Sequence, residues 1–155
     1  MAVIEYARNV LKIKKATSSE FSKTGVNVIG LIHEWNRDGK IFKGSKKELG
    51  GTMRLGLYEA KLKKNSLIQK IYRSNSINER HRHRYEVNID YKDKFEDKGL
   101  IFSGMSPDHK LPEIIELKNH PWFVGVQFHP EFKSRPLNPH PLFSSSVSYT
   151  HLRAH

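Results

Sequence analysis

A nearly continuous apolar run, WFVGVQF, occupies residues 122–128, and Pro121 and Pro130 bound it. An apolar run of this length between prolines predicts a strand that is covered on both faces, as in the central strands of an α/β sheet. The chain has 155 residues, which suits one domain with a core of its own. No apolar stretch approaches the roughly 18 residues of a membrane span, and no secretory signal is recognisable.

The rest of the chain has a mixed pattern, with more predicted strand than helix. Residues 1–15 carry an apolar stripe at helical spacing and predict a helix, and residues 17–19 predict a polar loop. The remaining expected elements are strands at 26–32, 52–62, 85–89, 100–104 and 113–117, a short helix capped by Ser66, and a helix over 92–98 that stops at Gly99. The strands at 100–104 and 113–117 can pair across the turn at 106–108.

The segment QFHPEF follows the apolar run directly and places His129 two residues before Glu131. In an extended segment such residues point to the same side. A carboxylate beside an imidazole fixes the tautomer of the ring and stabilises its protonated form, as a general base requires. The alternative is a histidine at a strand end beside an unrelated surface glutamate.

The segment RHRHR at residues 80–84 is the densest cluster of positive charge in a chain of net charge +11. His81 and His83 are weak candidates for metal ligands, because no third ligand accompanies them. Arginine in this segment is suited to a bidentate grip on a carboxylate. Two alternatives remain open: a positive edge strand that resists aggregation, and a surface that binds nucleic acid or another anion.

Two other features limit the chemistry. The segment GGTMRLG at 50–56 matches neither a P-loop nor a dinucleotide-binding fingerprint. The sequence contains no cysteine, which excludes a disulfide scaffold, a zinc ribbon and a cysteine nucleophile within these residues.

Taken in order, several segments resemble the C-terminal glutaminase domain of the CTP synthase family, a class I glutamine amidotransferase. These segments are EYARNV, SSEF, LGGTMRLG, ERHRHRYEVN, EIIE, NHPWFVGVQFHPEF and HPLF, and together they extend from Met1 to about Phe143. The resemblance implies an α/β fold with a Cys-His-Glu triad. In that family, cysteine attacks the side-chain amide of glutamine and releases ammonia, and water hydrolyses the resulting thioester.

The resemblance also assigns roles to individual residues. His129 and Glu131 match the histidine and glutamate of the triad. Glu20, in SSEF, matches the glutamate that binds the amino-acid end of glutamine, and Arg84 matches the glutamine-binding arginine. No metal site and no cofactor are expected in this chain.

The remaining partners follow from the resemblance as well. L-glutamine is the expected substrate, and the ammonia passes to a separate synthase domain that uses UTP, ATP and Mg²⁺ to make CTP. GTP is the expected activator, and the whole protein is expected to be a cytoplasmic homotetramer without membrane or nucleic-acid partners. The competing hypothesis is a non-catalytic module that binds an anion or nucleic acid.

The chain departs from the family at both ends. The nucleophile elbow and the first strands of the sheet lie upstream of Met1 in the family, so residues 1–143 are expected to be a partial amidotransferase domain. We therefore predict that the chain alone has no glutaminase activity. Residues 144–155 lack an apolar stripe and are expected to be a non-native or disordered tail.

Overall fold

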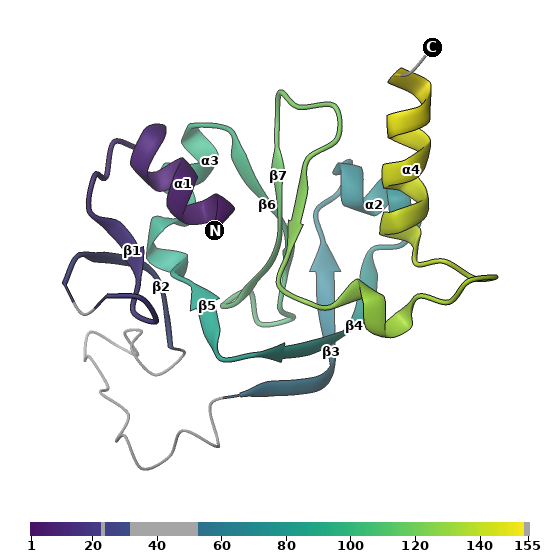
Figure 1. Ribbon diagram of the computed structural model, residues 1–155, viewed down its shortest axis with the longest axis horizontal. Coiled ribbons are helices and arrows are strands. Elements are labelled where there is room, and N and C mark those ends of the chain that lie inside the picture. The colour runs from purple at the N-terminus through teal and green to yellow at the C-terminus, as the bar shows by residue number, and fades with distance from the viewer. Residues whose placement is uncertain (23, 32–52, 154–155) are drawn as a thin grey trace.

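A computed structural model describes residues 1–22, 24–31 and 53–153 of the chain. Two sheets and the helices around them form the α/β fold (Figure 1). Residue 32, the end of one expected strand, and residue 52, the start of another, lie outside the described residues, as do Gly50 and Gly51.

The smaller sheet has three strands in the order β1-β2-β5. These strands are β1 (Ala16–Ser18), β2 (Val26–Leu31) and β5 (Tyr85–Val87). β1 is parallel to β2, and β5 is antiparallel to it. β1 replaces the polar loop that we expected at residues 17–19. Its small side chains are buried, because α1 (Ala2–Asn9) packs over this part of the sheet.

The larger sheet has five antiparallel strands in the order β4-β3-β6-β7-β8. They are β3 (Arg54–Leu62), β4 (Ser76–His83), β6 (Leu100–Met105), β7 (Pro112–Leu117) and β8 (Val124–Val126). The expected pairing of the strands on either side of residues 106–108 is confirmed, since β6 and β7 are neighbours.

Helices lie on both sides of this larger sheet (Figure 1). On one side are α1, the 3₁₀ turn η3 (Ile89–Tyr91) and α3 (Lys92–Asp97), and on the other are α2 (Leu67–Tyr72) and α4 (Pro141–Arg153). Each side has a hydrophobic core. Ile115 packs in the core with α1 and α3, whereas its neighbour Ile114 packs in the core with α2 and α4.

Local sequence signals placed the short helices correctly. The hydroxyl of Ser66 accepts a hydrogen bond from Gln69 N and begins α2. Gly99 follows α3 with φ of +96°, a conformation that glycine adopts readily. The first helix is shorter than expected, because it ends at Asn9 and the chain then passes through Lys12 with φ of +61°.

The apolar run at 122–128 was interpreted wrongly. It contributes only the three residues of β8, which are half-buried and lie at the end of the strand order. The strand covered on both faces is β7, whose residues from Pro112 to Glu116 are all buried. An apolar run indicates burial but does not indicate which neighbouring elements supply it.

The C-terminal segment also differs from the expectation of disorder, because α4 continues through Arg153. Its start is fixed by Leu142, which is buried in the core beside α2. Further along, Trp122 stacks on Tyr149 and donates a hydrogen bond from Nε1 to Ser145 Oγ at 2.8 Å. These contacts order a helix that has no apolar stripe. That residues 144–155 are non-native stays a prediction.

Gly104 allows β6 and β7 to approach closely, which leads to a first prediction. A Cβ atom at position 104 would lie 2.6–2.9 Å from three side-chain carbons of Ile114. We expect Gly104→Ala to lower the free energy of unfolding by about 1–3 kcal/mol in urea denaturation, because the core must shift. A second change, Ile114→Val, should recover part of this loss by removing the terminal methyl group. Unchanged stability of Gly104→Ala would contradict this packing.

Candidate functional site

The sequence-predicted pair of His129 and Glu131 comes together directly after β8. Nδ1 of His129 lies 2.8 Å from Oε1 of Glu131. The backbone is not extended as we assumed, because Pro130–Lys133 form a 3₁₀ turn, η4, that begins after His129. A hydrogen bond from Nδ1 makes Nε2 the basic nitrogen of the neutral ring. The same bond holds the pKa of the Glu131 carboxyl below its usual value.

His129 is held on the edge strand β4. Its backbone N–H donates to the carbonyl of Arg80 at 2.8 Å, and its ring stacks on Phe132 with centroids 5.0 Å apart. The side chain of His129 remains 35 % exposed, and that of Glu131 is 56 % exposed. The pair is therefore ordered by the sheet yet accessible to a reactant.

Glu20 and Arg84 lie at one end of the smaller sheet. Glu20 is exposed and follows the carboxyl end of β1, whereas Arg84 is half-buried and lies between β4 and β5. The last residue of β2, Leu31, is opposite Tyr85, so the carboxyl ends of β1 and β2 meet the start of β5. The strand register supports a shared location for Glu20 and Arg84, and their substrate-binding roles stay predictions.

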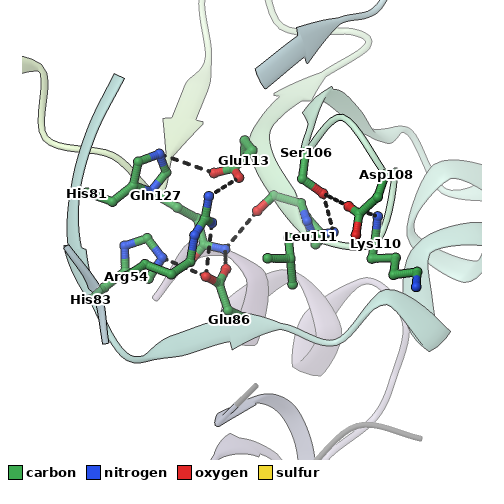
Figure 2. A network of polar contacts seen from close by, with 11 residues as sticks. Arg54, His81, His83, Glu86, Ser106, Asp108, Lys110, Leu111, Glu113 and Gln127 are labelled. Atoms are coloured by element: carbon green, nitrogen blue, oxygen red, sulfur yellow. Dashed lines mark hydrogen bonds and ion pairs between the residues drawn. The ribbon is translucent and has the colours of Figure 1, made fainter. Parts of the chain in front are cut away.

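Figure 2 shows a buried ionic network that the sequence analysis missed. Arg54 bonds to Glu86 at 3.1 Å and to Glu113 at 2.6 Å, and all three side chains are buried. Glu86 also bonds to His83 Nε2 at 2.8 Å and accepts a hydrogen bond from Gln127. Because Glu86 follows Arg84 by two residues and Gln127 precedes His129 by two, the network connects the strand ends that carry the predicted site residues.

Burial sets the protonation of this network. Burial raises the pKa of the Glu113 carboxyl, although the hydrogen bond and charge of Arg54 oppose the shift. His81 lies 3.6 Å from Glu113, and its pKa falls to about 3 because the ring is buried and faces the charges of Arg54, His83 and His129. His81 is therefore neutral at physiological pH.

The low pKa of His81 leads to a second prediction. Unfolded His81 takes up a proton below about pH 6.5, whereas the folded ring resists protonation down to about pH 3. The contribution of neutral His81 to stability is thus complete above about pH 6.5 and is lost as the pH falls towards 3. We expect His81→Gln to flatten the loss of stability between pH 7 and 5, measured by urea denaturation. The raised pKa of Glu113 changes the stability with pH in the opposite direction. To a first approximation this contribution is the same in the wild type and in His81→Gln. Parallel pH profiles of the two proteins would contradict the assignment.

The structure bears on two interpretations of RHRHR, the positive edge strand and the metal site. β4 is an edge strand with Arg80 and Arg82 exposed, as the edge-strand alternative expected. In the part of the chain that the structure describes, no group of three or more His, Cys, Asp or Glu side chains is arranged to hold a metal ion.

Among the helices of that same part, none is long and apolar enough to cross a membrane.

Comparison with known proteins gives consistent matches. A model of the class-I glutamine amidotransferases matches residues 2–148. The chain is 74 % identical over 147 residues to the CTP synthase of Pelagibacter ubique (strain HTCC1062), covering 95 % of this chain and 27 % of that protein. It is 60 % identical over 151 residues to the CTP synthase of Bartonella quintana (strain Toulouse), covering 97 % of this chain and 28 % of that protein.

A solved structure is similar over nearly the whole chain. It is the glutaminase domain of Trypanosoma brucei CTPS with bound acivicin, with a TM-score of 0.80 and 35 % identity, covering 95 % of this chain and 55 % of that one. The chain spans little more than a quarter of the length of its curated relatives. It belongs to the class I glutamine amidotransferases and corresponds to a segment of the glutaminase domain of CTP synthase.

Proposed function

We propose that this chain supplies the acid–base pair and the substrate anchors of a glutaminase that delivers ammonia for the synthesis of CTP from UTP. The observation that carries the proposal is the 2.8 Å contact between His129 Nδ1 and Glu131 Oε1 on an ordered, accessible turn. A histidine oriented by a carboxylate is the base that a nucleophile needs in acyl transfer.

The reaction divides between this chain and the rest of the whole protein. The sequence has no cysteine, so the nucleophile must come from outside these residues. Nε2 of His129 takes the proton of the thiol while sulfur bonds to the amide carbon of glutamine, and it then gives that proton to the departing ammonia. Water attacks the glutamyl thioester with the same base and releases glutamate and the thiol.

Charge accounts for the proposed binding of glutamine. The Glu20 carboxylate would hold the α-ammonium group, and Arg84 would hold the α-carboxylate through paired N–H donors. The location of both residues at one end of the smaller sheet supports this division of roles.

The whole protein would have further partners. Its synthase domain would bind UTP and ATP with Mg²⁺, GTP would activate the glutaminase, and the assembly would be a cytoplasmic homotetramer. Neither a membrane nor nucleic acid is a partner in this proposal, and the chain alone would not hydrolyse glutamine.

Exchanging the segment between relatives tests the function. In the exchange protein, the 147 aligned residues of the P. ubique CTP synthase are replaced by those of this chain. We expect this protein to form CTP from UTP and ATP with either glutamine or ammonia as the nitrogen source. CTP formation with ammonia but not with glutamine would contradict the proposed function, because the synthase part would then be intact and the glutaminase inactive.

A further inference from the structure

The turn that carries His129 and Glu131 is attached to the outer edge of β4. β4 is the first strand in the sheet order and β3 is its partner there. Two of its carbonyl groups accept hydrogen bonds from the neighbouring segment: Arg80 from the His129 backbone at 2.8 Å, and Asn78 from Lys133 Nζ at 2.6 Å. Residues two apart present their carbonyl groups on the same edge of a strand. The edge of β4 therefore fixes both ends of η4, which lies alongside it (Figure 1).

Lys133 has a second partner beneath the surface. Its Nζ lies 3.4 Å from Oε1 of Glu79, which is 1 % exposed. The same oxygen accepts hydrogen bonds from Tyr72 Oη at 3.0 Å and lies 3.0 Å from His140 Nε2. Burial would raise the pKa of Glu79, but the bond and charge of His140, followed by the charge of Lys133 and the bond from Tyr72, outweigh it and lower the pKa. Glu79 is thus a fixed anion to which Lys133 is attracted.

The geometry of η4 links this anchor to the proposed catalytic pair. Glu131 and Lys133 share one short turn, in which Phe132 N bonds to His129 O at 3.1 Å. A movement of Lys133 away from β4 would therefore rotate the turn and carry Glu131 away from the imidazole ring. Without the lysine, the His129 backbone bond attaches only the beginning of the turn to β4, and beyond the turn Ser134 Oγ still accepts a hydrogen bond from His140 N at 3.0 Å.

We propose that Lys133 is a positioning residue, which holds η4 against β4 so that Glu131 remains bonded to Nδ1 of His129. This keeps Nε2 of the neutral ring free of a proton. The catalytic meaning of the contact rests on the proposed function, whereas the contact itself can be measured without any activity.

The tautomer of His129 provides the measurement. In the ¹⁵N-histidine-labelled 155-residue chain above the pKa of the ring, two-bond ¹H–¹⁵N correlation spectra distinguish Nδ1–H from Nε2–H. We expect Nδ1–H to predominate in the wild type and in Lys133→Arg, which keeps the cation. Lys133→Met should lose this preference and approach the spectrum of Glu131→Ala, in which the acceptor is absent. Lys92→Met, which removes a lysine bonded to Glu96 on α3, is the matched control and should be unchanged.

The outcomes separate the positioning role of Lys133 from the proposed function. If Lys133→Met keeps the wild-type tautomer, or if Lys92→Met changes it equally, the proposal is wrong. In the exchange protein, Lys133→Met should lower kcat with glutamine by about tenfold and leave KM near its original value, because the anchors of glutamine are not altered. An unchanged kcat would also overturn the positioning role. If the exchange protein cannot use glutamine at all while the tautomer result holds, the proposed function is wrong. The role of Lys133 in keeping Glu131 bonded to His129 then still stands.

Discussion

Replacing Arg54 by methionine is expected to destabilise the chain by about 3–5 kcal/mol, because two buried carboxylates would lose their shared cation. Arg54 is 6 % exposed, and Glu86 and Glu113 are 0 % and 1 % exposed. A loss of this size is a large part of the roughly 5–15 kcal/mol that stabilises a typical domain. Urea denaturation of the 155-residue chain at pH 7 measures it. We expect a much lower midpoint, or a chain that no longer unfolds cooperatively.

Two comparisons sharpen the test. Arg82→Met removes an exposed arginine from the neighbouring strand and should change the stability by no more than about 0.5 kcal/mol. The destabilisation of Arg54→Met should shrink as the pH falls, because burial raises the pKa of Glu113 and protonation of this carboxylate removes an unpaired charge. A loss as small as that of Arg82→Met would show that the network does not stabilise the fold.

Replacing His129 by asparagine in the exchange protein is expected to lower kcat with glutamine by about 10²–10⁴-fold, the usual contribution of a general acid–base group. Asparagine cannot take the proton of the thiol or return it to ammonia. CTP formation with ammonia should stay at the level of the unsubstituted exchange protein, since His129 would act only on glutamine. Parallel assays with the two nitrogen sources give the ratio directly.

His109→Asn is the matched control for this change. His109 is exposed in the turn between β6 and β7 and has φ of +58°, which asparagine tolerates. We expect both activities to be retained. If His129→Asn hydrolyses glutamine as fast as His109→Asn does, the acid–base assignment must be abandoned.

The sequence was most informative where the structure depends on neighbouring residues. Ser66 begins α2 and Gly99 follows α3 because their preferences act within a few residues. His129 and Glu131 are two residues apart, so their contact could be expected even though the backbone between them forms a 3₁₀ turn rather than a strand.

Contacts between distant residues could not be read in this way. Arg54 bonds to residues 32 and 59 positions away, and GTMRLG gives no sign of them. The expected strand at 113–117 gave no sign of the partners of its two glutamates. Glu113 pairs with Arg54, and Glu116 accepts hydrogen bonds from two backbone N–H groups at the start of α2. Charges that are satisfied internally allow a strand with two acids to be fully covered.

The placement of η4 outside both cores has an evolutionary consequence. The His129–Glu131 turn is joined to the sheet at its edge and contributes little to either core, whereas the ionic network of Arg54 lies inside the fold. Substitutions in the turn can therefore abolish or redirect chemistry while the domain stays above its threshold of stability. A descendant of this chain could keep the architecture and lose the His129–Glu131 pair, but it could not readily exchange the buried arginine.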